Sequence, residues 1–403
     1  MFLLMGHELV NLATISCLGS SRDEILPKLF TPGIDTLTLS SDFLRGESCY
    51  VGMIKAELPQ IPRSVSELDS RFARIVFTLY LELEKEVMDL KRIFGADRIG
   101  IVFASSTSGI DKSEAAFRDR GNKDRFPEWF TFFNQEIGAG SALLSRLSGC
   151  TGPSYTISTA CSSGGKVFES ARLLLDLGVC DAVILGGADA LCQMTLRGFK
   201  SLDLVSGSKA NPMSRNRCGL NIGEGGALFI MLKGDCGIQL KGVGESCDAY
   251  HISSPEPEGR GAEAAILGAL KRSGESSFDR VKYLNLHGTA TVLNDLMESR
   301  AVHRLFGDSV PCSSTKPLTG HLLGACGALE AGFLFYMLES GPGKIRLPLH
   351  IWDNERDPEL PSVSLVSTNT EIDLGRGDLL LSSSFAFGGN NCCVSLGFGR
   401  EMV

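Results

Sequence analysis

TISTACSSGG (residues 156–165) places a β-branched run directly before a cysteine, small residues and two glycines, and KVFESARLLLDLG (166–178) follows it with apolar residues at helical spacing. β-Branched residues favour strands, and a period near 3.6 favours a helix. The stretch therefore predicts a strand that turns sharply into a helix, with Cys161 in the turn. Such a turn lifts a side chain out of the sheet at the positive end of a helix dipole, which lowers the pKa of a thiol. An inert core cysteine in the same geometry is the alternative.

The rest of the chain alternates short β-rich runs with helical patterns, which indicates an α/β fold with largely parallel strands. The strands are expected at 98–105, 154–159, 181–189, 227–233, 281–289, 378–387 and 392–398, and the helices at 66–93, 166–177, 261–272, 295–306 and 322–339. A strand meets a small-residue turn both at TACSSGG and at SSSFAFGGNN (382–391), which indicates two similar halves. We place them at residues 1–240, with the cysteine, and 241–403, with the two distinctive histidines described below.

Composition narrows the classes of function. The 403 residues are 43% hydrophobic and 21% charged, as in a folded globular protein. The net charge of −8 disfavours bulk nucleic-acid binding, and charge or glycine interrupts every apolar run before it reaches membrane-spanning length. The thirteen cysteines are odd in number, without zinc-like spacing. These features predict a reduced, cytoplasmic protein with no membrane or nucleic-acid partner and no metal site.

Two histidines lie where strands are expected to end. His287 closes YLNLHGTAT (283–291), and His321 precedes a small-residue helix in STKPLTGHLLGACGALEAG (314–332). Active sites of α/β folds collect at such ends, and imidazoles beside a cysteine suit nucleophilic catalysis. Lys316 can tune the nearby imidazole. Glu330 reaches the same site only if its helix points inward; a solvated face is the alternative.

Five motifs together resemble those of the β-ketoacyl-acyl carrier protein synthases, or condensing enzymes. They are TISTACSSGG, NPMSRNRCGLNIGEGGALFIM (211–231), NLHGTATVLND (285–295), SSTKPLTGHLLGACGALEAG (313–332) and SSSFAFGGNN. The resemblance implies a thiolase-like five-layered αβαβα sandwich of two similar halves. It also implies decarboxylative condensation of an acyl-cysteine with malonyl-acyl carrier protein, in fatty-acid or polyene and polyketide elongation. No cofactor is implied, because acyl carrier protein brings its substrates on a phosphopantetheine arm.

The resemblance also assigns roles to residues. Cys161 resembles the acylated nucleophile, His287 and His321 the pair used in decarboxylation and condensation, and Lys316 the lysine that supports them. Phe387 resembles the gating phenylalanine whose N–H shares the oxyanion hole with that of Cys161. The remaining matches are Thr289 and Thr291 as pantetheine ligands, Phe199 and Phe385 as pocket-lining residues, and Glu330 and Asp295 as supporting residues.

Three positions depart from the family pattern. Asn390 stands where threonine is usual, Cys218 where an acidic residue is usual, and Cys326 where a small residue such as alanine is expected. Asn390 brings the packing of the loop beside the oxyanion hole into question. STKPLTGH and NRCGLNIGEGGA resemble ketosynthases of polyene or specialised polyketide clusters.

Two alternatives to an active condensing enzyme remain. One is a chain-length-factor-like subunit of a ketosynthase heterodimer, although such subunits typically lack the cysteine that is present here. The other is a thiolase, which would need a second reactive cysteine near the C-terminus, whereas Cys392 and Cys393 look like strand residues. The family implies a homodimer, or a heterodimer with a related subunit. Carrier-protein docking would need a local basic patch, for which Arg63, Arg71, Arg74 and Lys200 are candidates, with scattered solvated charge as the alternative.

Overall fold

An eleven-stranded mixed sheet organises the molecule. The computed structural model describes residues 6–121, 123–274 and 278–401. In sheet order, the strands are β13 (Ser364–Leu365), β11 (Pro311–Ser313), β10 (Val281–Asn285), β15 (Leu379–Phe385), β16 (Asn390–Phe398), β9 (Ile238–Cys247), β1 (His7–Ile15), β8 (Gly225–Lys233), β6 (Ala182–Asp189), β4 (Ile99–Ala104) and β5 (Ser154–Ile157).

The same five-strand pattern occurs twice in this sheet. Numbered by their order along the chain, β1, β8, β6, β4 and β5 follow the order 1-5-4-2-3, and β9, β16, β15, β10 and β11 repeat it. In each set the first two neighbouring pairs are antiparallel and the last two parallel. β1 and β9 join the sets through an antiparallel pairing of Glu8 with Gln239 and Leu9 with Ile238. This repetition confirms the two similar halves that the sequence predicts.

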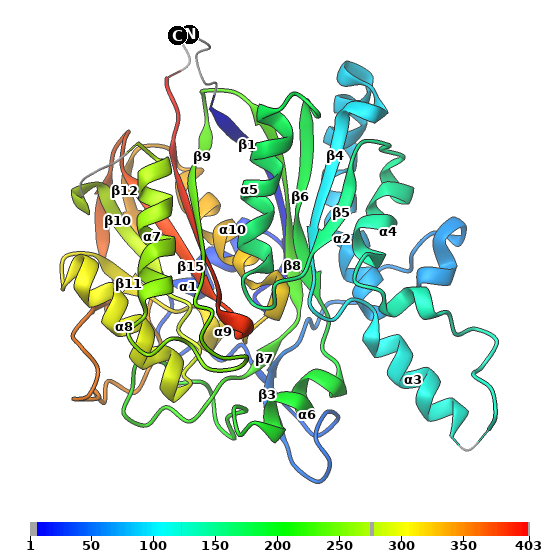
Figure 1. Cartoon of the computed structure of the whole chain (residues 1–403), viewed down its shortest axis with the longest axis horizontal. Helices are drawn as coiled ribbons and strands as arrows, with labels where there is room; N and C mark the ends of the chain where they lie inside the picture. Colours follow the sequence, from blue (N-terminus) through cyan, green and yellow to red (C-terminus); the bar gives the residue numbers. More distant parts are fainter. Residues whose placement is uncertain (1–5, 122, 275–277, 402–403) are drawn as a thin grey trace.

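Helices separate the two halves and cover their outer faces. α5 (Ser163–Asp176) and α10 (Cys326–Leu338) lie between the halves, and each contacts strands of both (Figure 1). α2 (Arg71–Phe94) and α4 (Ala139–Ser148) cover the first half, and α7 (Arg260–Arg272), packed with α8 (Val292–Phe306), covers the second. All thirteen residues of α10 are buried, as expected for a helix that is apolar on nearly every side. These layers form the predicted αβαβα sandwich.

The two central helices meet at their N-termini. A Cβ added to Gly164 would lie 2.6 Å from the backbone nitrogen of Ala328, and one added to Gly327 would lie 2.7 Å from the backbone nitrogen of Gly165. Only residues without a side chain fit this contact. The small residues of both motifs therefore bring two helix N-termini, with their positive dipole ends, to one point.

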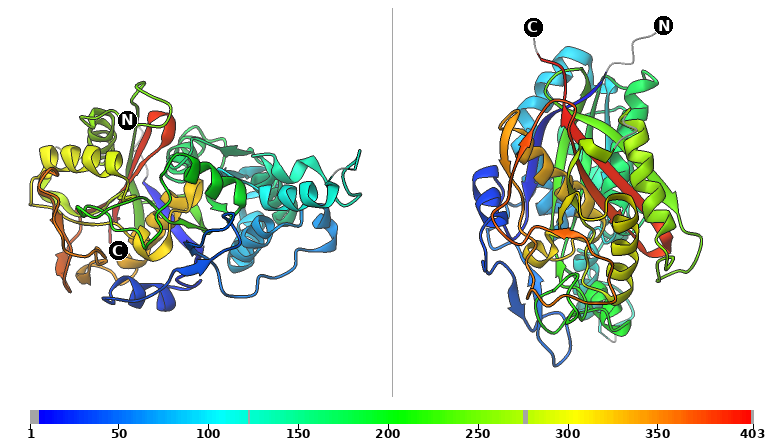
Figure 2. Two further views of the ribbon diagram at one scale, coloured as in Figure 1. Left: turned by 90° about the horizontal axis from the view of Figure 1, so that it is seen from below. Right: turned by 90° about the vertical axis from the view of Figure 1, so that its left-hand side faces the viewer.

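The predicted elements of both halves are present, with differences at their ends. The first long helix begins at Arg71 and not at residue 66, because the Ser70 side chain caps it by accepting a hydrogen bond from Ala73 N–H. Among the described residues, five further α-helices lie outside the expected set: α1 (Arg22–Leu29), α3 (Ile110–Arg120), α4, α6 (Gln193–Ser201) and the short α9 (Lys316–Thr319). α3 extends from the end of the molecule that carries β4 and β5 (Figures 1 and 2).

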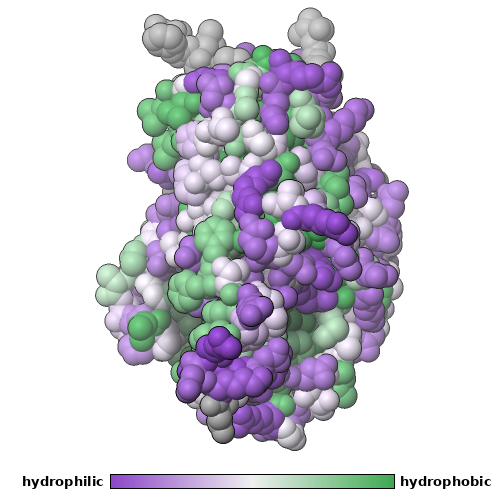
Figure 3. Space-filling view, turned by 90° about the vertical axis from the view of Figure 1, so that its right-hand side faces the viewer, coloured by the Kyte–Doolittle hydropathy of each residue, from purple (hydrophilic) through white to green (hydrophobic). Residues whose placement is uncertain are grey.

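The face beside α3 and α4 carries apolar patches among hydrophilic side chains (Figure 3). Exposed apolar residues in this part of the chain include Phe117, Trp129, Phe132 and, on the edge strand β5, Tyr155. Across the described residues, every helix is too short or too polar to traverse a lipid bilayer.

Candidate active site

Cys161 sits in a strained turn between β5 and α5, as the sequence predicts. Ala160, directly before it, has a φ of +52°, a left-handed conformation that costs energy for any residue with a Cβ. Ser163 N–H donates to the Ala160 carbonyl at 3.1 Å, which tightens the turn into the helix. The turn points the cysteine sulfur away from the sheet and into the centre of the molecule.

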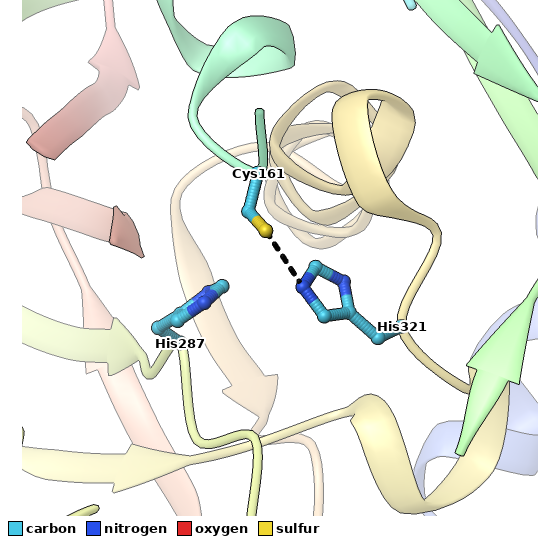
Figure 4. Close-up of side chains that lie close together, drawn as sticks. All are labelled: Cys161, His287 and His321. Atoms are coloured by element: carbon cyan, nitrogen blue, oxygen red, sulfur yellow. Dashed lines mark hydrogen bonds between the residues drawn. The ribbon is translucent and has the colours of Figure 1, made fainter. Parts of the chain in front are cut away.

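The cysteine and two histidines meet there, although they lie far apart in the sequence (Figure 4). The Cys161 sulfur is 3.1 Å from His321 Nε2, and the two imidazole rings are 5.3 Å apart, nearly perpendicular. One side-chain nitrogen or sulfur of each of the three residues lies within 4.8 Å of the other two. His287 follows β10 and His321 precedes α10, so the second half supplies both imidazoles and the first half supplies the cysteine. The predicted constellation of Cys161, His287 and His321 therefore exists as one cluster.

The resting cysteine is a neutral thiol, contrary to the lowered pKa expected from its place beside a helix. Burial raises the pKa of Cys161 to about 11, and this outweighs the lowering by Lys316 and by backbone N–H groups. Those N–H groups belong to Phe387 and to Cys161 itself, and they hydrogen-bond to the sulfur. The same two donors would stabilise a negative oxygen at this position.

Both histidines are neutral. Burial is the main cause that lowers the pKa of His287 and His321 well below the ordinary value, and the positive charge of Lys316 lowers both further. Leu323 N–H donates to His321 Nδ1 at 3.2 Å, which assigns the proton of the neutral ring to Nε2. His321 thus presents an N–H donor to the sulfur. His287 Nδ1 is buried and has no hydrogen-bond partner among the residues that the structure describes, so it can bind a substrate.

Lys316 and Glu330 form a buried ion pair behind the histidines. Lys316 Nζ lies 2.7 Å from Glu330 Oε1, and the two side chains are 2% and 1% exposed. Burial alone would lower the pKa of Lys316, but Cys326 and Glu330 raise it, so the lysine stays protonated. Cys326 also donates its S–H to Glu330 Oε1 at 3.4 Å. The inward orientation of Glu330 is confirmed, and the solvated alternative is wrong.

Two cavities open from the cysteine. One, of about 300 Å³, contains Cys161, both histidines, Thr289, Thr291 and Phe385 in its wall. The other, of about 400 Å³, runs along α6 past Thr107, Met194 and Leu202. Cys161, Phe199 and Phe387 line both cavities, so the sulfur stands at their junction. An elongated substrate could thus reach the thiol from one side and extend a chain into the other.

The aromatic residues named from the sequence surround this junction. The rings of Phe199 and Phe387 lie 5.5 Å apart and tilted, and the ring of Phe385 lies 5.9 Å from that of His287. Phe387 begins a short 3-10 turn, Phe387–Gly389, in which Gly388 has a φ of +80°. The Phe387 ring therefore lies where the two cavities meet.

The remaining predicted residues support the wall of the first cavity. The Thr289 and Thr291 hydroxyls lie 2.9 Å apart and face the cavity. Asp295 is fully buried, where it accepts hydrogen bonds from the backbone N–H groups of Met213 (2.8 Å) and Ala290 (3.2 Å). Burial raises its pKa to about 6. Asp295 is therefore a loop anchor at a distance from the reacting atoms.

Two carboxylates that position the site were missed in the sequence. Glu298 accepts hydrogen bonds from the backbone N–H groups of His287 (2.6 Å) and Gly288 (2.7 Å), and so fixes the histidine turn. Asp189, at the end of β6, accepts from the residues after β4 and from Ala325 N–H at 3.1 Å. An acidic residue at a strand end, as in GGAD (186–189), was the available signal for the second.

Three of the four candidate docking cations are held in ion pairs. Arg71 binds the buried carboxylate of Glu224, Arg74 pairs with Asp69 at 2.8 Å, and Lys200 pairs with Glu47 at 2.7 Å. This favours the alternative of scattered, locally neutralised charge over one basic patch.

The C-terminal cysteines have no place in this site. Cys392 and Cys393 are buried in β16, where strand pairing holds them. Both are absent from the residues that line the two cavities, so the arrangement that a thiolase needs is missing from the described chain.

Comparison with known proteins agrees with this geometry. The family model of the beta-ketoacyl synthase N-terminal domain matches residues 51–235, and that of the C-terminal domain matches residues 238–344. The chain is 30% identical over 326 residues to a 3-oxoacyl-[acyl-carrier-protein] synthase 2 of Synechocystis, a match that covers 76% of each protein. A Staphylococcus aureus protein of the same name is 30% identical over 319 residues, covering 74% of this chain and 77% of its own length.

Solved structures extend the similarity to the whole fold. A chain of the complex between the ketosynthase ApeO and its chain length factor ApeC, from Xenorhabdus doucetiae, matches with 36% identity and a TM-score of 0.90 over 99% of this chain and 99% of its own length. The ishigamide ketosynthase/chain length factor matches with a TM-score of 0.85 at 22% identity, over 98% of this chain and 100% of the other, which supports the fold alone. With two domain models matched in order and the cysteine and histidines gathered in one cavity, this chain belongs to the β-ketoacyl synthase family.

Proposed function

We propose that the protein is an acyltransferase of the β-ketoacyl-acyl carrier protein synthase type, which joins an acyl group on Cys161 to a malonyl unit with loss of carbon dioxide. The observation that carries the proposal is the meeting of the Cys161 sulfur, two neutral imidazoles and two backbone N–H donors at the junction of two cavities. Each group has a separate task in the reaction.

Acyl transfer comes first. The Cys161 sulfur attacks the carbonyl carbon of an acyl thioester, a C–S bond forms, and the bond to the pantetheine sulfur breaks. The proton of the thiol leaves with that sulfur, so the products are acyl-Cys161 and a free pantetheine thiol. The Cys161 and Phe387 N–H groups stabilise the negative oxygen of the tetrahedral intermediate.

Decarboxylation follows in the same cavity. The malonyl thioester loses carbon dioxide, and the electron pair of the broken C–C bond becomes an enolate. His321 Nε2–H and the His287 ring, both neutral, donate hydrogen bonds to the developing enolate oxygen. Burial, together with the positive charge of Lys316, keeps the imidazoles from taking up a proton, so the rings carry no fixed positive charge. The enolate carbon then attacks the carbonyl carbon of acyl-Cys161, a C–C bond forms and the C–S bond breaks. The β-ketoacyl product leaves, and the released Cys161 thiolate takes up a proton from water.

The chemistry needs no metal or redox cofactor in this proposal. A cysteine and two histidines are potential zinc ligands, but Lys316, protonated and buried beside them, opposes a second cation. The assigned Nε2 proton of His321 also points at the sulfur and leaves that nitrogen without a lone pair for a metal.

The proposed partners are acyl carrier protein and a second synthase-like subunit. The first cavity offers Thr289 and Thr291 hydroxyls to a pantetheine arm. β5 is an edge strand of the sheet with unpaired backbone groups, and the second cavity reaches exposed Met194 and Leu202. A partner that covers this face would complete the cavity. The similarity to a chain of the complex between the ketosynthase ApeO and its chain length factor ApeC favours a heterodimer with a related subunit.

A chain-length-factor-like role is the second candidate function. It is supported by the similarity to a complex that contains both a ketosynthase and a chain length factor. Carbon dioxide release, measured with the purified protein alone and mixed with a candidate partner, distinguishes a synthase from a chain-length-factor-like subunit. A synthase releases carbon dioxide from malonyl-carrier protein through its own His287 and His321. A chain-length factor leaves this rate unchanged when those two histidines are substituted.

Cys161→Ala is the direct test. It should abolish acyl mass on the peptide that contains residue 161 and abolish β-ketoacyl product, while circular dichroism stays that of the wild type. The control is Cys218→Ala, which removes an exposed thiol of the same cavity and should keep acyl transfer. Product formation by Cys161→Ala at the wild-type rate would show that the sulfur has another role.

A further inference from the structure

Asn390, the residue that departs from the family pattern beside the oxyanion hole, forms a contact with the nucleophile's own helix. The Lys166 Nζ atom donates to Asn390 Oδ1 at 3.3 Å. Lys166 follows Cys161 by five residues on α5, and Asn390 follows the turn of Phe387 by three residues at the start of β16. We propose that Lys166, acting through Asn390, is a positioning residue that holds Phe387 N–H in the oxyanion hole. This inference rests on the proposed function.

The turn that carries Phe387 is also held by the loop that follows β9. Gly388 N–H donates to the Ile252 carbonyl at 2.8 Å, and Asp248 N–H donates to the Gly389 carbonyl at 2.8 Å. Asn391 Nδ2 donates to Asp248 Oδ1 at 2.7 Å. These bonds tie the turn to the loop after β9, which does not carry the nucleophile.

An oxyanion hole needs a fixed distance between its two donors. One donor, the Cys161 N–H, belongs to the start of α5, and the other, the Phe387 N–H, belongs to the turn. Among the described residues, the hydrogen bond from Lys166 to Asn390 joins a side chain of α5 to the residue that directly follows this turn. Lys166 lies in the first turn of α5, which begins two residues after Cys161, so the lysine connects the segment that carries one donor with the turn that carries the other.

The residues around Lys166 restrict the movement of its side chain. Its side chain is only 14% exposed, and Glu245 on β9 lies 3.9 Å from Nζ. Beside it, a Cβ added to Gly165 would lie 2.8 Å from the Cys392 sulfur, so α5 and β16 are in direct contact there. A lysine confined in this way loses little further freedom when it binds Asn390, which favours a persistent contact.

The test compares Lys166→Met, Asn390→Ala and the double variant in three assays on the protein with its subunit partner. The assays are acylation of Cys161 by an acyl-carrier thioester, carbon dioxide release from malonyl-carrier protein, and β-ketoacyl formation. Loss of an entire oxyanion donor typically costs ~10²–10³-fold. A displaced donor should cost less, and we expect each single variant to lower kcat for acylation and condensation by about 10-fold. KM and carbon dioxide release should stay unchanged, because the histidines serve decarboxylation.

Double and control variants complete the design. The double variant should be no slower than either single variant, because both remove the same contact. Asn390→Asp should keep activity with Lys166 present, since a carboxylate also accepts from the lysine. Glu245→Gln removes only the ion-pair partner and should leave all three rates at the wild-type level.

Three results would overturn the inference: single variants with wild-type acylation rates, additive losses in the double variant, or an equal loss in Glu245→Gln. If Lys166→Met does not fold, Asn390→Ala carries the same test on the partly exposed turn. Failure of the proposed function would look different, because the wild type itself would then form neither acyl-Cys161 nor β-ketoacyl product.

Discussion

Replacing Lys316 by methionine should destabilise the protein far more than the loss of an ordinary lysine. Lys316 and Glu330 are 2% and 1% exposed, so the variant leaves a buried carboxylate without its partner. Removing one member of a buried pair costs about 3–5 kcal/mol of unfolding free energy. Lys200 and Glu47 provide a matched control, since they lie at the same 2.7 Å separation but are 42% and 56% exposed. Lys200→Met should cost at most about 1 kcal/mol.

Urea unfolding followed by circular dichroism and by tryptophan fluorescence measures both losses, and coincidence of the two signals checks that unfolding is cooperative. Lys316→Met/Glu330→Leu should be more stable than Lys316→Met, because apolar side chains replace both charges together. The loss in Lys316→Met should also persist at 1 M salt, since buried charges are poorly screened. A loss equal to that of Lys200→Met, or a double variant that shows the sum of two single losses, would refute this account of the pair.

Three further outcomes follow from the site and its scaffold. Alkylation of Cys161 by iodoacetamide, read on its peptide by mass spectrometry, should accelerate with pH beyond pH 10, because its pKa is about 11; a plateau near pH 8 would contradict this. His287→Ala should retain acyl-Cys161 formation while carbon dioxide release falls by ~10²-fold or more; parallel loss of both steps would contradict the division of tasks. Gly164→Ala should lower the unfolding midpoint strongly, since its Cβ would lie 2.6 Å from the Ala328 nitrogen, whereas Gly198→Ala meets no atom within 4 Å and should be neutral or stabilising. Equal midpoints for these two variants would show that the helix contact tolerates a side chain.

The sequence was most informative where chemistry depends on short motifs. The turn at Cys161 and the histidines at strand ends could be named because each lies in a local pattern of strand, small residues and helix. α3 could not be predicted in this way, because IDKSEAAFRDR buries only Ser113 and Ala116 and so has no apolar period.

Properties that depend on burial could not be predicted. The pKa of Cys161 was expected to be low from its helix, but the closed cavity reverses the direction, and a sequence does not show how closed a cavity is. Glu298 and Asp189 accept hydrogen bonds from backbone N–H groups that only the fold brings next to them. No residue type at a fixed spacing in the sequence predicts such contacts.

The close contact of Gly164 and Gly327 has a consequence for how the protein matures. The first half supplies α5 and the second supplies α10, and these helices leave no room for a side chain between them. Neither half can therefore complete its packing alone. The thiol comes from one half and the imidazoles from the other, so a nascent or cleaved chain would carry the reactive groups without the enclosure that governs them. Assembly of the thiol with the two imidazoles is thereby tied to docking of the second half against the first.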